Sequence, residues 1–156
     1  MDYDKVLQLL RELHNHKVEY VLVGGMALNI FGLVRPTDDV DLFVRPTEEN
    51  IARLRKALRA VWDDPAIDEI AADELAGDIP VVRYGPPDSD LIVDVISRLG
   101  TAFQYEDIEF TIQSHDGIPV RLATPRMLYR MKRDTIRSRD RGDAERLMEK
   151  FEFEDE

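Results

Sequence analysis

The chain has 156 residues, of which 44% are hydrophobic, and a formal net charge of −11 at pH 7. It has no cysteine, which excludes disulfides and thiolate metal sites. No apolar run approaches the roughly 20 residues of a membrane span, and the N-terminus, Met1-Asp2-Tyr3-Asp4, lacks the basic and apolar segments of a secretory signal. We therefore expect a cytoplasmic protein that makes no contact with a membrane.

Taken in chain order, the hydrophobic pattern predicts helices and strands that do not alternate regularly. Thr47 and Thr124 are expected N-caps, and the predicted helices cover residues 3–17, 26–31, 47–61, 71–75, 124–138 and 140–151. The predicted strands cover residues 18–23, 39–44, 79–84, 91–96, 108–114 and 118–122, with a helix or turn at 101–107. We expect one α+β domain over residues 1–156, a mixed β-sheet flanked by helices, with residues 124–151 as a C-terminal helical segment.

A glycine pair, Gly24-Gly25, stands between the predicted strand at 18–23 and the short helix that follows. Glycine permits a tight turn and a close approach of the backbone to a ligand. The free N–H groups at the start of a helix attract phosphate. This segment therefore predicts a phosphate-binding turn.

Two aspartates, Asp39 and Asp41, lie on the next predicted strand. At positions i and i+2 their carboxylates point to the same face, while Val40 and Leu42 face a core. A phosphate site beside two parallel carboxylates is what metal-assisted phosphoryl or nucleotidyl transfer requires. Two solvent-facing acids on an exposed strand are the alternative.

The order of glycine pair, short helix and Asp-Val-Asp-Leu resembles the signature of the DNA polymerase β-type nucleotidyltransferase superfamily. The flanking Arg35-x-Thr37-x-Asp39 resembles the small bacterial branch, which includes antibiotic nucleotidyltransferases and AbiEii-like toxins. The resemblance implies the nucleotidyltransferase fold. It also implies that Asp39 and Asp41 hold two Mg²⁺ ions and that Gly24 and Gly25 bind the triphosphate of an NTP.

A third acid, Asp94, interrupts the apolar run Leu91-Ile92-Val93-Asp94-Val95-Ile96. An ionised carboxylate among such residues is costly unless it is paired or bound to a metal. The superfamily has its third acid on a later strand, and the resemblance implies that Asp94 shares a metal ion and acts as the base towards the acceptor hydroxyl. An exposed strand edge, or a pair with an arginine, is the alternative.

Arg35 and Thr37 lie just before the first two acids, and we assign both to the nucleotide-binding site. In one interpretation Arg35 contacts phosphate. In the other, which is equally open, it holds the loop in place by pairing with a nearby acid.

The C-terminal part of the chain is basic, since residues 121–146 carry a net charge of +5 and the rest carries −16. The stretch from Thr124 to Asp143, in which a helix lysine precedes an Arg-x-Arg-Asp cluster, resembles the late motif of the AbiEii-like branch, and this implies that Lys132 reaches the nucleotide phosphates. The same segment indicates a polyanion bound at one place, and we assign it to an acceptor RNA through Arg133, Arg137, Arg139 and Arg141. A surface lysine and a solvated helix face are the alternatives.

Together these features predict a magnesium-dependent nucleotidyltransferase that transfers an NMP from an NTP to an acceptor. The acceptor is an RNA, such as tRNA in a toxin-like role, or else a protein or a small molecule, and an operon-encoded partner protein is compatible with the resemblance. The alternative is a non-catalytic nucleotide-binding module that acts as a regulatory or antitoxin partner. The three acids argue against that alternative, because a retired site has little reason to retain costly carboxylates.

Overall fold

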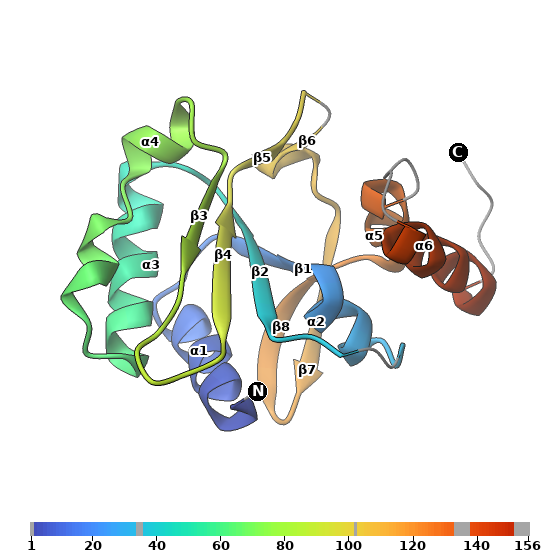
Figure 1. The fold of residues 1–156 in the computed structure, drawn as a ribbon, viewed down its shortest axis with the longest axis horizontal. Helices are drawn as coiled ribbons and strands as arrows, with labels where there is room; N and C mark the ends of the chain where they lie inside the picture. The colour runs from blue at the N-terminus through green and yellow to red at the C-terminus, as the bar shows by residue number, and fades with distance from the viewer. Residues whose placement is uncertain (1, 34–35, 102, 133–137, 152–156) are drawn as a thin grey trace.

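The fold is built on a mixed six-stranded sheet with the strand order β3-β4-β2-β1-β8-β7 (Figure 1). The computed structural model describes residues 2–33, 36–101, 103–132 and 138–151, the last range without the side chains of 138–144. Neighbouring strands are antiparallel except β2–β4 and β1–β8, which are parallel. The strands are β1 (Tyr20–Val23), β2 (Asp39–Val44), β3 (Val81–Tyr84), β4 (Ile92–Ile96), β7 (Phe110–His115) and β8 (Ile118–Ala123).

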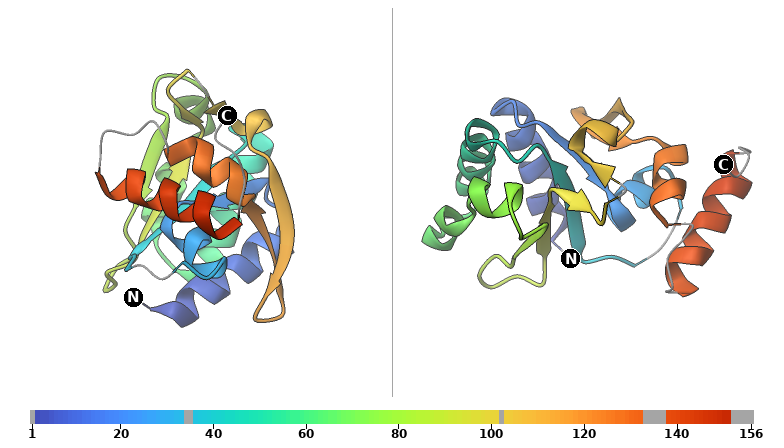
Figure 2. Two further views of the ribbon diagram at one scale, coloured as in Figure 1. Left: turned by 90° about the vertical axis from the view of Figure 1, so that its right-hand side faces the viewer. Right: turned by 90° about the horizontal axis from the view of Figure 1, so that it is seen from above.

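The helices lie on two sides of this sheet, as the two further views in Figure 2 also show. On one side lie α1 (Tyr3–Asn15), α3 (Glu48–Val61), the 3₁₀ turn η1 (Pro65–Glu69) and α4 (Ala72–Ala76). On the other side α5 (Pro125–Lys132) and α6 (Ser138–Phe151) pack against each other, while α2 (Gly24–Ile30) packs against β1 and β2. A small ribbon of β5 (Arg98–Leu99) and β6 (Phe103–Gln104) precedes the 3₁₀ turn η2 (Tyr105–Asp107). The predicted α+β fold is confirmed.

Side-chain caps fix where two of the helices begin, as the sequence predicted. The Thr47 side chain accepts a hydrogen bond from Asn50 N at 3.2 Å, and Thr124 Oγ1 accepts one from Met127 N at 3.1 Å. Each satisfies one of the N–H groups that a helix start leaves without an intrahelical partner. The cap at Thr124 therefore sets where α5 begins, and Lys132 is the last described residue of this helix.

The buried apolar residues form one continuous hydrophobic core, and the apolar face of β2 lies in this core. Val40 and Leu42 are fully buried, whereas Asp39 and Asp41 are only half-buried on the opposite side of the strand. Helices α1 and α3 bury their apolar stripes in the same core. Within the described part of the chain, no helix has the length and apolarity needed to span a membrane.

Several element boundaries differ from the sequence prediction, and the end of α1 has a clear local cause. Helix α1 ends at Asn15, and Lys17 adopts a positive φ of 56° that a helix does not allow. Helix α2 begins at Gly24 itself, two residues before the predicted start. Residues 103–107 form a short strand and then a 3₁₀ turn in place of the helix or turn predicted from 101.

Candidate active site

A row of paired residues crosses four strands of the sheet and brings the charged groups together. Arg83 on β3 pairs with Asp94 on β4, Asp94 pairs with Asp41 on β2, and Asp41 pairs with Val23 at the end of β1. Directly paired residues project from the same face of a sheet. The register therefore places Arg83, Asp94 and Asp41 side by side, with the glycine turn that follows Val23 next to them.

Asp39 joins this row from two residues earlier on β2 and completes a cluster of three carboxylates. One oxygen from each of Asp39, Asp41 and Asp94 lies within 4.8 Å of the others. Asp94 is buried, with 8% of its surface exposed. Clustered carboxylate oxygens are the ligands that Mg²⁺ prefers, so the donor set fits the metal that the sequence predicted.

Gly24 is required by its contact with Asp41. Its φ is +73°, in the left-handed region that side chains disfavour. A Cβ atom built there would overlap the Asp41 Oδ2 atom. The glycine thus lets the backbone of the turn lie directly against the carboxylate, a close approach that no other residue allows.

The charge on Asp41 is costly in the metal-free protein. Burial first, and then the charges of the neighbouring carboxylates Asp94 and Asp39, together raise the pKa of Asp41 from its ordinary 3.8 to about 6. Lys132 opposes this effect. A bound cation would relieve the cost, which is a second respect in which the cluster fits a metal.

Arg83 holds Asp94 with both arms of its guanidinium group, and the sequence reasoning missed it. Its Nε donates to Asp94 Oδ1 at 3.0 Å and its Nη2 to Oδ2 at 3.2 Å, while 66% of the arginine side chain stays exposed. The expectation that a buried Asp94 must be metal-bound or paired is therefore met by pairing in this structure. Only the antiparallel register of β3 and β4 reveals the partner, because the two residues are eleven positions apart.

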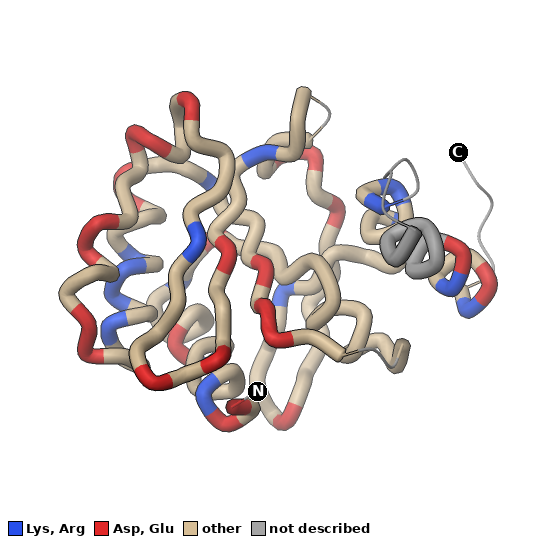
Figure 3. Tube along the Cα trace, in the orientation of Figure 1, with Lys and Arg blue, Asp and Glu red and all other residues tan. Residues whose placement is uncertain are grey.

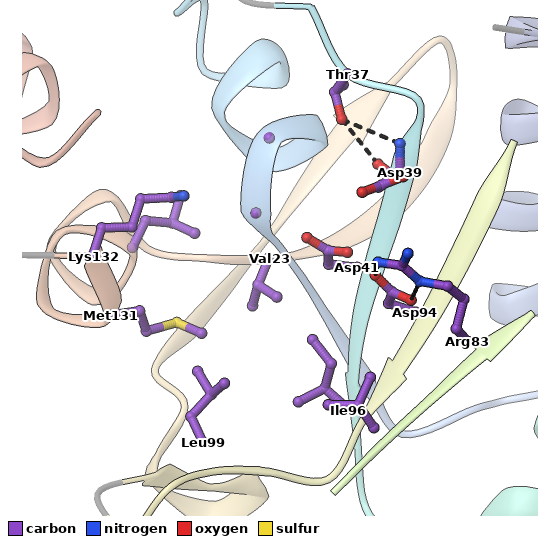
Figure 4. Close-up of a pocket in the computed structure, with 14 residues that line it drawn as sticks. Val23, Thr37, Asp39, Asp41, Arg83, Asp94, Ile96, Leu99, Met131 and Lys132 are labelled. Carbon is purple, nitrogen blue, oxygen red and sulfur yellow. Dashed lines mark hydrogen bonds and ion pairs between the residues drawn. The ribbon is translucent and has the colours of Figure 1, made fainter. Parts of the chain in front are cut away.

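A cavity of about 330 Å³ opens over this cluster, between the sheet and α5 (Figure 4). Every nucleotide or metal candidate that the structure describes lies on its wall: Gly24, Gly25, Thr37, Asp39, Asp41, Asp94 and Lys132. The Thr37 hydroxyl donates to Asp39 O at 3.2 Å and accepts from Asp39 N at 3.3 Å, so it also fixes the entry into β2. Lys132 reaches the cavity from the far side, opposite the carboxylates.

The remaining predicted site residues lie outside what the structure describes. Arg35, Arg133 and Arg137 belong to ranges that are not described, and Arg139 and Arg141 fall within α6 where side chains are not described. In Figure 3, Lys and Arg positions lie along the trace of α3 and at α5, while Asp and Glu positions lie on the trace of the central strands.

Comparisons with known proteins show that the fold is that of the nucleotidyltransferases. A model of the family described as "Nucleotidyl transferase AbiEii toxin, Type IV TA system" matches residues 8–153. The chain therefore belongs to the AbiEii nucleotidyltransferase family. No curated protein matches the chain.

Solved structures share the fold at low sequence identity. The nucleotidyltransferase-like antigenic protein of Paracoccidioides brasiliensis superposes with a TM-score of 0.56 at 17% identity, covering 93% of this chain and 73% of that one. ANT(2")-Ia in complex with adenylyl-2"-tobramycin gives 0.56 at 12% identity, covering 94% and 87%. A Thermotoga maritima protein assigned as a nucleotidyltransferase gives 0.55 at 14% identity, covering 96% and 92%. At these low sequence identities the comparison shows a shared fold and nothing more.

Proposed function

We propose that the protein is a magnesium- and NTP-dependent nucleotidyltransferase, with residues 1–156 acting as one catalytic domain in the cytoplasm. The observation that carries this proposal is the cluster of three carboxylates within 4.8 Å of one another beside the Gly24 turn. The reaction forms a bond between the α-phosphorus of the NTP and an acceptor oxygen. It breaks the bond to the β-phosphate, and pyrophosphate leaves.

Asp39, Asp41 and Asp94 hold Mg²⁺, as two ions, in this proposal. When bound, the metal supplies positive charge that offsets the negative charge building on the transferred phosphoryl group. The close contact of Gly24 with Asp41 supports this assignment, because it keeps any side chain out of the space over the carboxylates.

The other cavity residues bind the triphosphate and the acceptor. Backbone groups of Gly24 and Gly25, with Thr37, position the triphosphate, and Lys132 places a positive charge across the cavity from the acids. Arg35, which lies outside the described residues, is assigned to the triphosphate from its sequence motif alone. Asp94 takes the proton of the acceptor hydroxyl, and Arg83 keeps its carboxylate in one orientation.

The acceptor in this proposal is an RNA, such as tRNA, bound along the C-terminal basic segment. That segment carries a net charge of +5 in a chain of net charge −11, and its described start, α5, borders the cavity. A protein or a small molecule is the alternative acceptor. The family name, which refers to a type IV toxin–antitoxin system, supports a toxin-like role and an operon-encoded partner.

The test is to incubate the protein with each of four α-labelled NTPs, Mg²⁺ and total RNA or lysate. Label should enter the RNA, pyrophosphate should be released, and EDTA should stop both. Asp39→Asn and Asp41→Asn should abolish transfer in a folded protein, while Asp90→Asn, at an exposed position outside the cavity, should not.

The Arg83–Asp94 pair gives a specific reason to test the non-catalytic alternative as well. A permanent internal counter-ion on the third acid would suit a module that binds nucleotide without turning it over. Nucleotide binding without any release of pyrophosphate would favour that function over catalysis.

A further inference from the structure

The two edges of the sheet differ in how well they are protected against pairing with another chain. The strand order places β3 at one edge and β7 at the other (Figure 1). β3 is four residues long, follows directly after Pro80 and carries Arg83. Short edge strands, charged side chains and prolines all hinder association through a sheet edge. β7 has six residues, FTIQSH, with no proline and no acidic or basic residue except His115, so it lacks this protection.

The register of β7 with β8 determines which of its backbone groups point outward. The Glu109 carbonyl oxygen accepts a hydrogen bond from Thr124 N at 3.1 Å. Residues of an antiparallel strand alternate between those bonded to the neighbouring strand and those whose N–H and C=O groups point away from it. Because Glu109 bonds towards β8, the groups of Phe110, Ile112 and Ser114 point outward. Within the described residues, no strand pairs with this edge.

Two large apolar side chains are exposed on the same strand. Ile112 is 63% exposed, the highest fraction among the large hydrophobic residues that the structure describes, and Phe110 is 39% exposed. The two residues are two positions apart, so they project from one face of the sheet. An exposed apolar strand with outward backbone groups is a template for pairing with another strand.

A second copy of β7 matches this edge in one antiparallel register. When Ile112 lies opposite the partner's Ile112, Phe110 lies opposite the partner's Ser114. Each outward N–H group of one strand then faces an outward C=O group of the other, and all three outward residues of each copy are paired. In the same register Glu109 lies opposite the partner's His115. No like charges face each other along the strands, an arrangement that would destabilise the pair.

We propose that β7 pairs with β7 of a second copy of this chain, in the antiparallel register centred on Ile112. The two-fold axis passes between the two isoleucines, so the same edge is covered on both copies and the assembly closes as a dimer. One pair of short strands buries less surface than a standard interface, so the dimer is weak and depends on protein concentration. No residue of β7 is among the described residues that line the active-site cavity, so the proposal does not depend on the nucleotidyltransferase function.

The first test measures mass by sedimentation equilibrium over a range of protein concentrations. Wild type should form dimers as the concentration rises, and more readily in added salt, because salt screens the repulsion between copies of net charge −11. Ile112→Lys should raise the dissociation constant of the dimer by at least about a hundredfold, since it removes apolar contact on both copies and places like charges opposite each other. Ile79→Lys, at an apolar position that is 41% exposed outside β7, is the matched control and should leave the dimer intact.

The second test examines the register. Because Ile112 faces its own counterpart, Ile112→Lys and Ile112→Glu should each be monomeric alone and should associate when the two proteins are mixed. The chain has no cysteine, so Ile112→Cys can be oxidised to a covalent dimer without competing thiols. Opposite residues of a hydrogen-bonded pair have Cα atoms about 5.5 Å apart, within the range of a disulfide. Thr111→Cys, which would lie opposite the partner's Gln113, should cross-link much less.

Four results would overturn the proposal. The first is a wild type that stays monomeric at its highest soluble concentration in high salt, and the second is a dimer that persists unchanged in Ile112→Lys. The third is cross-linking of Thr111→Cys as readily as of Ile112→Cys. The fourth is loss of RNA binding in Ile112→Lys without any change in mass, which would assign the β7 edge to a different partner. Each leaves the proposed nucleotidyltransferase function standing, because transfer of label from NTP tests that function separately.

Discussion

Replacing Asp41 with asparagine should stabilise the metal-free protein while abolishing its activity. The pKa of Asp41 is raised from 3.8 to about 6, first by burial and then by the charges of Asp94 and Asp39. A shift of about two units corresponds to about 3 kcal/mol, since one unit is about 1.4 kcal/mol. Asparagine has nearly the same shape and no charge, so the variant should gain about this free energy of unfolding at pH 7.

The pH dependence gives the sign of the effect. Because the folded-state pKa of Asp41 lies above the unfolded value, the folded protein binds more protons between about pH 4 and 6. The destabilisation by Asp41 is therefore nearly absent near pH 4, grows as the pH rises towards 6 and is constant above it. The free energies of unfolding of wild type and Asp41→Asn should therefore differ by less than about 1 kcal/mol near pH 4 and by about 3 kcal/mol at pH 7.

The assay is urea unfolding in EDTA at several pH values between 4 and 8, with Asp90→Asn as a control for loss of an exposed carboxylate. At pH 7 the gain corresponds to a rise in Tm of about 6–12 °C for a protein of this size. Added Mg²⁺ should narrow the gap, because a cation that binds the native wild-type site stabilises it by mass action. The electrostatic reasoning would be refuted if Asp41→Asn were less stable than wild type at pH 7, or if the difference in their free energies of unfolding did not change with pH.

Three further sets of variants test other parts of the site. Gly24→Ala should abolish the rise in Tm that Mg²⁺ and NTP produce together, because its Cβ overlaps Asp41 Oδ2; a preserved rise would contradict the close-approach argument. Arg83→Ala should lower kcat by about tenfold or more with little change in the KM for NTP, with partial rescue by Arg83→Lys; Arg98→Ala, which removes a charge outside the carboxylate cluster, is the control. Changing Arg133, Arg137 and Arg141 together to glutamate should weaken RNA binding and reduce its salt dependence, whereas Lys132→Ala should impair the use of NTP. Gel-shift titrations at two salt concentrations measure the RNA binding of the triple variant. A salt dependence equal to that of wild type would show that these three arginines do not bind RNA.

The sequence predicted the parts of the site that are local in the chain. Asp39 and Asp41 share a face because residues two apart on a strand always do, and the glycine turn lies where the apolar run of β1 ends. The fold class followed from the hydrophobic pattern and the motif. These features depend on neighbours in sequence, so one sequence is enough to predict them.

The parts that the sequence did not predict depend on which strands pair and in what register. Arg83 is an ordinary strand residue until β3 pairs with β4 and places it beside Asp94. The cavity likewise needs both the β5 ribbon and α5 to lie beside the sheet, which places Leu99 and Met131 in its lining. Periodicity assigns a residue to a face of its own element, but it does not say which residue of another element lies beside it.

The unequal surroundings of the acids lead to a last prediction, on the variant Asp94→Asn. Asp94 already has a guanidinium on both of its oxygens, whereas the raised pKa of Asp41 marks that carboxylate as under-neutralised. Asp94→Asn relieves the repulsion that Asp41 experiences, but the amide keeps only one acceptor oxygen and no charge. It therefore loses one of the two hydrogen bonds from Arg83 and weakens the other, where each is worth about 1.5–3 kcal/mol before the exposure of Arg83 is allowed for.

These two effects oppose each other, so Asp94→Asn should change the free energy of unfolding by less than about 1 kcal/mol, far below the gain from Asp41→Asn. The same urea titration in EDTA at pH 7 measures both variants. A stabilisation by Asp94→Asn equal to that by Asp41→Asn would mean that the Arg83 pair contributes nothing in solution. The charge of Asp94 would then need a bound cation for its neutralisation as much as that of Asp41 does. The proposed role of Arg83 in positioning the Asp94 carboxylate would also be wrong.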